Sequence, residues 1–113
     1  MKLWLDDIRE PWRYGALGWE WVKTAKEAIA LLETGRVTHA SLDHDLLPEH
    51  YPWNCPSIEN CTDTGYDVVC WMEEQDVWPP EGVTCHSANP AGRARIEAVI
   101  AKHEAQIKSP ENT

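Results

Sequence analysis

Three short apolar runs of this sequence end abruptly in polar residues of the kinds that bind metal ions or transfer protons. The run "THASL" is closed by Asp43 and His44, and the runs "KLWL" and "GVTC" end in a similar way. One such group taken alone is most often a solvated turn, because Asp and Ser favour turns. Three groups that meet in space would instead form a site. The groups are Asp6, Asp7 and Arg9; Asp43, His44 and Asp45; and His86, Ser87 and Asn89.

Short strands alternate with helices along the chain, and this alternation must position the three groups. An α/β alternation with right-handed crossovers gives a mainly parallel sheet with helices on its faces. Ligands bind such sheets outside the carboxyl ends of the strands, so we expect all three polar groups at the same edge. The strands are predicted at residues 2–5, 19–24, 37–42 and 82–86.

The helices are recognised from their first residues. The segments "TAKE" and "TGYD" have the spacing of a capping box, and "NPAGR" places proline at the favoured first helical position. We therefore predict an α/β fold of three layers around a mainly parallel four-stranded sheet. Residues 1–108 are expected to form a single domain, followed by a C-terminal tail at 109–113.

The composition excludes several classes of partner. With 42% hydrophobic and 26% charged residues among 113, the chain has the composition of an ordinary globular domain. Its net charge of -9 argues against binding duplex DNA but permits a small phosphorylated ligand held by a metal ion. No apolar run approaches the roughly 20 residues that span a membrane, and the N-terminus lacks an apolar signal segment. We therefore expect a cytoplasmic protein without a membrane partner.

The carboxylates at the strand ends are the first candidate ligands. Asp6, Asp7 and Asp43 would crowd one edge of the sheet, where unpaired carboxylates repel one another. A hard divalent cation relieves that repulsion, and Mg²⁺ is usually held by one or two carboxylates together with substrate phosphate. These residues are therefore the predicted ligands for Mg²⁺ or another divalent cation. The alternative is that each Asp begins a loop or caps a helix, and Asp45 is expected only to orient its neighbours.

The histidines are candidates for proton transfer. His44 and His86 follow neighbouring strands, so both could face one reacting phosphorus. One imidazole would then accept a proton from the attacking hydroxyl or water, and the other would protonate the leaving oxygen. Two alternatives remain open: a nitrogen-rich metal site, or one ring that points sideways and caps a loop. His39 and His103 are expected to be structural.

The third group supplies further candidates. Ser87 could bind a phosphoryl oxygen or act as a nucleophile, although a single Ser at a strand end is more often a turn residue. Asn89 starts a helix, where free backbone N–H groups favour an anion. Arg9 and Arg93 are the predicted phosphate contacts. The candidate catalytic residues are thus Asp43, His44, His86 and Ser87, and the candidate substrate-binding residues are Arg9, Asn89 and Arg93.

The cysteines do not form an obvious framework. Cys70 and Cys85 lie in apolar helical and strand patterns and are predicted to be buried free thiols. Cys55 and Cys61 lie in a long loop and could form part of a zinc site with His50. Their spacing is poor for zinc, and a fourth ligand is not evident. Loop cysteines without a special role are the favoured interpretation.

Four separated segments resemble the cyclic-phosphate-processing receiver-like family, a divergent relative of the receiver domains of bacterial response regulators. The segments are "LWLDDIREP", "THASLDHDL", "TGYDVVCWMEE" and "HSANPAGRARIEAVI", and the resemblance extends to about residue 103. In receiver domains an acidic pair follows the first strand, a phospho-accepting Asp the third, and a Ser or Thr the fourth. The resemblance places Asp6-Asp7, Asp43 and Ser87 at those positions.

The sequence also departs from the receiver pattern. The first helix is reduced to a loop at 8–18, and no fifth strand with the receiver lysine follows the last helix. The resemblance therefore implies a truncated receiver fold of the flavodoxin-like type. His44 and His86 are additions to the receiver pattern. The loop at 46–63 looks longer than is typical, and could cover the site or bind a partner.

The resemblance implies chemistry on cyclic phosphates, either RNA ends bearing a 2',3'-cyclic phosphate or cyclic nucleotides. The leading hypothesis is a metal-dependent phosphoesterase, or a binder, of such a phosphate. One alternative is a stand-alone receiver domain phosphorylated on Asp43, against which the missing lysine strand counts. Another is a non-catalytic protein that sequesters a cyclic nucleotide.

Overall fold

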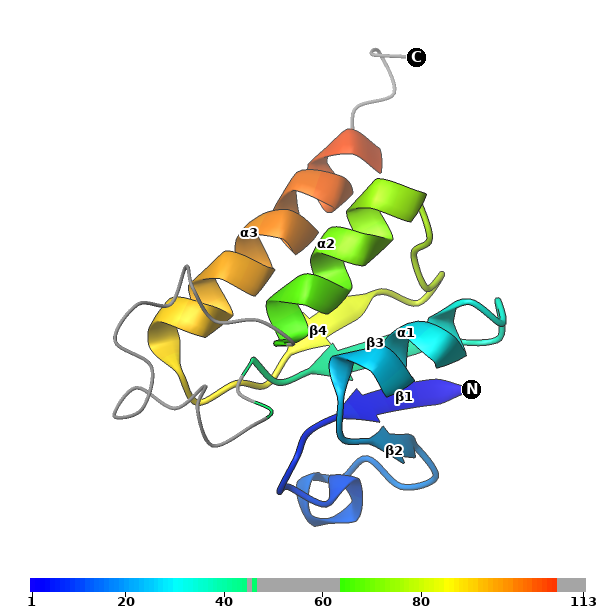
Figure 1. Cartoon of the computed structure of the whole chain (residues 1–113), viewed down its shortest axis with the longest axis vertical. Helices are drawn as coiled ribbons and strands as arrows, with labels where there is room; N and C mark the ends of the chain where they lie inside the picture. Colours follow the sequence, from blue (N-terminus) through cyan, green and yellow to red (C-terminus); the bar gives the residue numbers. More distant parts are fainter. Residues whose placement is uncertain (45, 47–63, 108–113) are drawn as a thin grey trace.

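Four parallel strands form the central sheet of the computed structural model, which describes residues 1–44, Leu46 and 64–107. The spatial order is β2-β1-β3-β4, and all three neighbouring pairs are parallel (Figure 1). This arrangement confirms the predicted mainly parallel four-stranded sheet. The strands are β1 (Lys2–Leu5), β2 (Glu20–Val22), β3 (His39–Leu42) and β4 (Val83–Cys85).

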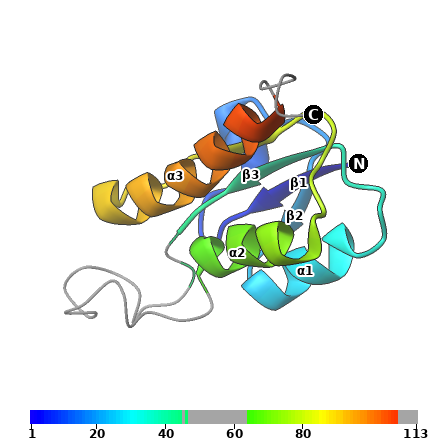
Figure 2. The ribbon, with the colours of Figure 1, turned by 90° about the horizontal axis from the view of Figure 1, so that it is seen from above.

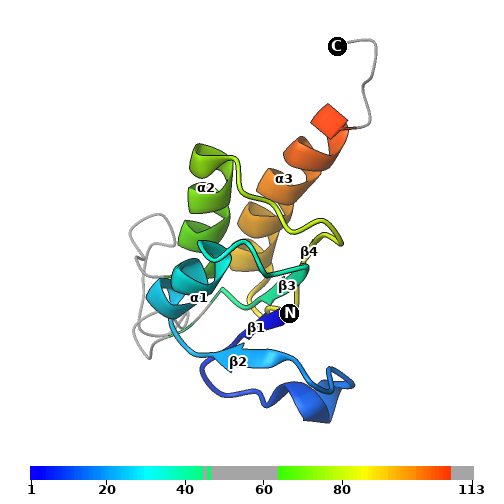
Figure 3. The ribbon, with the colours of Figure 1, turned by 90° about the vertical axis from the view of Figure 1, so that its right-hand side faces the viewer.

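In the described part of the chain, three α-helices connect and follow these strands. Helices α1 and α2 lie side by side on one face of the sheet, and α3 packs against α2 and β4 (Figures 2 and 3). Each crossover helix returns the chain to a parallel strand, as right-handed βαβ units do. The helices are α1 (Ala25–Leu32), α2 (Gly65–Gln75) and α3 (Pro90–Ile107).

The hydrophobic core lies between the sheet and this helical layer. Because successive strand residues point to opposite faces, Leu3 and Leu5 of β1 share a face with Ala40 and Leu42 of β3. All four are fully buried. They join apolar side chains of the three helices in one cluster, among them Ala28, Leu32, Val68, Met72, Ile96 and Ile100.

The second face of the sheet is covered differently. Between β1 and β2, where every residue is described, the chain forms only a 3₁₀ turn, η1 (Pro11–Tyr14). Trp4 points to this face, and the rings of Tyr14 and Trp19 lie against it with centroids 6.0 and 6.1 Å away. The third layer is thus built from this segment and its aromatic side chains, consistent with the predicted reduction of the first receiver helix.

The predicted capping boxes differ in completeness. Thr64 caps α2 with both reciprocal bonds, since its hydroxyl accepts from the backbone of the first turn and Asp67 Oδ2 accepts from the Thr64 N–H at 3.0 Å. At α1 the Thr24 hydroxyl accepts from the Glu27 N–H, but Glu27 Oε1 accepts from the Lys23 N–H, at 3.2 Å. The first box is therefore only half formed.

The two described cysteines are free thiols, as predicted. Cys85 is buried in β4, and burial raises the pKa of its thiol to about 11, whereas Cys70 is only partly buried. No helix in the described part of the chain is long and apolar enough to cross a membrane.

Replacing Thr64 should test the α2 cap, because Thr64 is buried and its hydroxyl is the cap acceptor. We expect Thr64→Ala to lower the free energy of unfolding by about 1 kcal/mol, measured by chemical denaturation. Thr64→Ser keeps the hydroxyl and should retain most of the stability. Equal losses in the two variants would show that the buried methyl group, and not the cap, is responsible.

Candidate functional site

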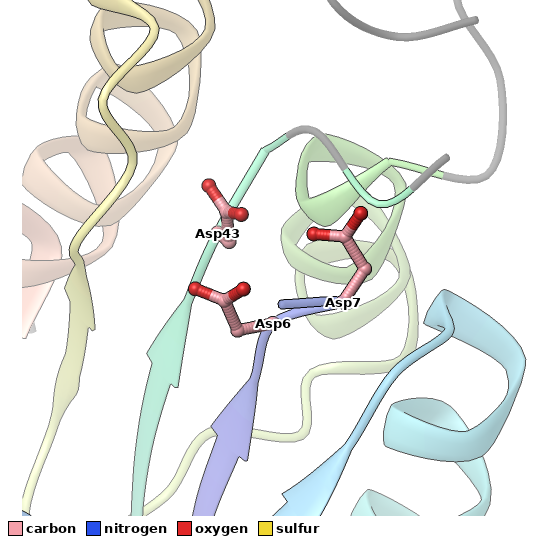
Figure 4. A group of neighbouring side chains, drawn as sticks. All are labelled: Asp6, Asp7 and Asp43. Atoms are coloured by element: carbon pink, nitrogen blue, oxygen red, sulfur yellow. The ribbon is translucent and has the colours of Figure 1, made fainter. Parts of the chain in front are cut away.

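Three carboxylates meet at the carboxyl ends of β1 and β3. Asp6 and Asp7 follow β1, Asp43 follows β3, and one oxygen of each lies within 4.8 Å of the others (Figure 4). Asp6 and Asp43 are buried, and Asp7 is half-buried. The sheet hydrogen bonds continue past the strand ends, where the Asp43 N–H donates to Leu5 O at 2.9 Å. Sheet register therefore sets the spacing of these groups, as predicted from the strand-end rule.

The carboxylate of Asp6 is held by four contacts. Its Oδ1 accepts from the backbone N–H groups of Ile8 and Arg9 at 2.8 and 2.7 Å. Its Oδ2 lies 3.0 Å from His86 Nε2 and 3.3 Å from Arg9 Nη1. Burial alone would raise the pKa of Asp6, but the hydrogen bonds from His86 and from the Arg9 and Ile8 backbone outweigh it and lower the pKa. Asp6 is therefore ionised at neutral pH.

Arg9 supplies positive charge to the cluster. Its Nη1 lies 3.3 Å from Asp6 Oδ2 and 3.6 Å from Asp43 Oδ2, so one guanidinium nitrogen bridges two of the three carboxylates. Burial alone would lower the pKa of Arg9, but the charges of Asp43 and Asp6 raise it. The predicted substrate-binding residue Arg9 is thus part of the same cluster.

His86 lies between Asp6 and a residue that we did not predict. Its Nδ1 is 2.7 Å from Ser41 Oγ, and its Nε2 is 3.0 Å from Asp6 Oδ2. The imidazole also stacks on Trp4, with ring centroids 3.9 Å apart and planes inclined by 7°. Strand alternation could have revealed Ser41, because β3 pairs Ser41 with Trp4 and places both on the face of Asp43.

Two tryptophans fix the loop that follows β1. Trp21 Nε1 donates to Asp6 O at 2.7 Å, and Trp4 Nε1 donates to Arg9 O at 2.8 Å. Indole N–H groups removed from water, even in part, usually find such an acceptor. The two contacts hold the main chain of the acidic turn at both ends.

His44 lies on the other side of the sheet from His86. The His44 imidazole is fully buried against Gly92 in the first turn of α3, whereas His86 stacks on Trp4. A methyl group at Gly92 would overlap that ring. The prediction that both histidines face one phosphorus is therefore not met by this geometry, which matches the alternative of one ring pointing away.

The remaining candidates surround the start of α3. Ser87 Oγ accepts from the Asn89 N–H at 3.1 Å, and Asn89 Oδ1 accepts from the Gly92 N–H at 3.2 Å. Both residues therefore serve the beginning of the helix, the alternative raised for Ser87. Arg93 is half-exposed, and its Nε pairs with Glu97 Oε2 at 3.1 Å.

Some predicted features lie outside the described residues. They are Asp45, the zinc alternative of His50, Cys55 and Cys61, the loop at 46–63 apart from Leu46, and the tail at 109–113.

The contact between His44 and Gly92 predicts that alanine at position 92 destabilises the protein, the opposite of the usual effect of replacing a helical glycine. Alanine in place of a helical glycine usually stabilises by up to about 1 kcal/mol. Here Gly92→Ala should destabilise the protein by about 1–3 kcal/mol, because the site is already filled by the imidazole. In the His44→Ala background, Gly92→Ala should be neutral or stabilising. A double-mutant cycle tests this: chemical denaturation of the unmodified protein, the two single variants and the double variant gives the free energies of unfolding.

The control for this cycle is His103, which stacks on Trp78 with ring centroids 3.9 Å apart. His103→Ala and Gly92→Ala should be additive within about 0.5 kcal/mol. Additivity of Gly92→Ala with His44→Ala would contradict the packing described above.

The family model of the cyclic-phosphate processing receiver domain matches residues 1–102. Searches of curated proteins and of solved structures gave no match.

Proposed function

Because the chain belongs to the cyclic-phosphate processing receiver domain family, we propose that it is a metal-dependent phosphoesterase. Its substrate would be a small cyclic phosphate, either a 2',3'-cyclic-phosphate RNA end or a cyclic nucleotide. The observation that carries the proposal is the meeting of three carboxylates, Arg9 and His86 at the carboxyl edge of the sheet. The carboxylates, the Arg9 guanidinium and the His86 imidazole lie within reach of one another there. They are, respectively, candidates for binding a metal ion, binding a phosphate and transferring a proton.

The donor set fits a hard divalent cation. Asp6, Asp7 and Asp43 offer oxygen atoms within 4.8 Å of one another, and Mg²⁺ prefers oxygen ligands and keeps open positions for water and phosphate. A bound cation would polarise the phosphoryl oxygen and neutralise developing charge. Zinc is a poorer fit because no described thiol belongs to the cluster.

His86 is the better placed of the two histidines for proton transfer. Its side chain is 17% exposed and contacts Asp6, whereas His44 has no exposed surface. Its pairing with Asp6 and Ser41 fixes the plane of the ring, as a carboxylate orients a catalytic histidine in other enzymes. We assign His86 to proton exchange with the substrate. Both ring nitrogens contact protein atoms here, Nδ1 with Ser41 and Nε2 with Asp6, so Nε2 would have to leave Asp6 Oδ2 to meet the substrate. We assign His44 to packing beneath α3. Ser87 and Asn89 would act by presenting the N-terminus of α3 to an anion.

Metal binding can be tested without a substrate. Titration calorimetry with Mg²⁺ should show one site, and Asp43→Asn should weaken it at least tenfold because a carboxylate ligand becomes a neutral amide. Asp76→Asn is the matched control, since Asp76 is exposed beyond α2 and asparagine tolerates its left-handed backbone (φ 55°). A similar loss in both variants would indicate a general charge effect and not a site.

Catalysis can be tested with a panel of cyclic nucleotides and RNAs bearing a 2',3'-cyclic phosphate, with and without Mg²⁺. His86→Gln, assayed at saturating Mg²⁺, should lower kcat on a cleaved compound by about 10²-fold or more. His44→Ala should affect activity only in proportion to the fraction unfolded. Cleavage of no compound in the panel would contradict the enzyme proposal, and tight binding without turnover would favour a sequestering protein.

A receiver domain phosphorylated on Asp43 is the second candidate. The position of Asp43 beside Asp6 and Asp7, at the end of the third strand in the chain, favours it. Incubation with acetyl phosphate and Mg²⁺ should give a stable mass gain, absent in Asp43→Asn, if this candidate is correct.

A further inference from the structure

Arg9 is anchored by its main chain and not by its side chain. Its N–H donates to Asp6 Oδ1 at 2.7 Å, and its carbonyl accepts from Trp4 Nε1 at 2.8 Å. These two bonds fix the Cα position on both sides of the residue. The guanidinium can therefore change place by rotation of the side chain alone, without opening the loop.

The contacts of the guanidinium are long. Nη1 lies 3.3 Å from Asp6 Oδ2 and 3.6 Å from Asp43 Oδ2, whereas charge-assisted N–H···O⁻ bonds are typically about 2.7–2.9 Å. A single nitrogen makes both contacts, and the side chain is 31% exposed. The guanidinium thus compensates the charge of the two carboxylates without forming short hydrogen bonds to them. Because its side chain is partly exposed, it can move into solvent.

The same oxygens are those that a cation needs. Ionised carboxylates accept at about four positions, and the contacts of Asp6 with Ile8, Arg9 and His86 occupy all four. Oxygen ligands of Mg²⁺ lie about 2.0–2.1 Å from the metal. A cation held by Asp6 and Asp43 would need the carboxylate oxygens that Arg9 Nη1 contacts, and it would take over the charge-compensating role of the arginine.

We propose that Arg9 and a divalent cation compete for Asp6 and Asp43, so that cation binding releases the Arg9 guanidinium to bind the substrate phosphate. This inference rests on the proposed function, because it takes the three carboxylates to be the cation site. Before the cation binds, the arginine offsets the repulsion among the carboxylates. After it binds, the same arginine stands at the rim of the site with its donors available to an anion. Cation and phosphate therefore bind with positive cooperativity.

Mg²⁺ affinity of the whole chain, measured by calorimetry, tests the competition. Arg9→Gln removes the competing charge and should bind Mg²⁺ at least tenfold more tightly than the unmodified protein. Arg13→Gln is the matched control: Arg13 belongs to the same loop, is 70% exposed and pairs with Glu10 at 3.2 Å. It should change the affinity by less than about twofold, as expected for a screened surface charge.

The outcomes separate the two proposals. If the unmodified protein binds Mg²⁺ and Arg9→Gln binds it no more tightly than Arg13→Gln does, the competition is wrong and the cation site stands. If no variant binds Mg²⁺, the cation site and the competition both fail. If Arg9→Gln unfolds without Mg²⁺, Arg9→Lys is measured in its place. Because lysine keeps a positive charge, the gain in Mg²⁺ affinity should then be smaller than that expected for Arg9→Gln.

Release of the guanidinium has a second readout in the unmodified protein. Affinity for inorganic phosphate should be at least fivefold higher with saturating Mg²⁺ than without it, and Arg9→Gln should remove most of that gain. A phosphate affinity that does not respond to Mg²⁺ would overturn the release step. A gain of equal size in Arg9→Gln would show that the cation alone attracts the phosphate and that Arg9 takes no part.

Discussion

Repulsion among three carboxylates is the constraint on which this site depends. Asp6, Asp7 and Asp43 converge because parallel strands place their carboxyl ends at one edge, and Asp6 and Asp43 are largely removed from water. Such charges must be compensated. The protein does so with backbone N–H groups, with Arg9 and with His86, and the lowered pKa of Asp6 reflects that these contacts outweigh its burial.

The compensation in turn explains why the loop after β1 is so firmly held. The turn must present two N–H groups to Asp6 Oδ1 and bring Arg9 over Asp43. The indole N–H groups of Trp4 and Trp21 fix its two ends. Where other receiver domains are expected to place a first helix, this chain has a 3₁₀ turn and a layer of aromatic rings. The aromatic layer thus serves both as the cover of the sheet and as the support of the site.

The residues after the strands were predictable to different degrees. Apolar runs and helix caps predicted which segments form strands, and the rule for parallel sheets predicted that the strand ends meet. This reasoning identified five residues of the cluster: Asp6, Asp7, Asp43, Arg9 and His86. His44 was assigned to the site because it follows Asp43 in the chain. Its ring instead packs against Gly92 in the first turn of α3 and is not part of the carboxylate cluster. Within β3, side chains alternate between the two faces of the sheet. The same alternation places Ser41 on the site face, although its own position within an apolar run gave no sign of chemistry.

By itself the sequence determined the α/β class, the parallel sheet, the α2 capping box and the edge at which polar residues gather. These depend on local patterns that a short window contains: apolar periodicity, caps and strand ends. Only the tertiary structure decided which of those residues touch. It stacked His86 on Trp4 between Ser41 and Asp6, buried His44 beneath Gly92 and laid Arg9 across Asp6 and Asp43. The contacts of His86 and His44 join residues far apart in the chain. The contact of Arg9 depends on the turn that brings its guanidinium back over the strand ends. The geometry of all three contacts is therefore set by packing and sheet register.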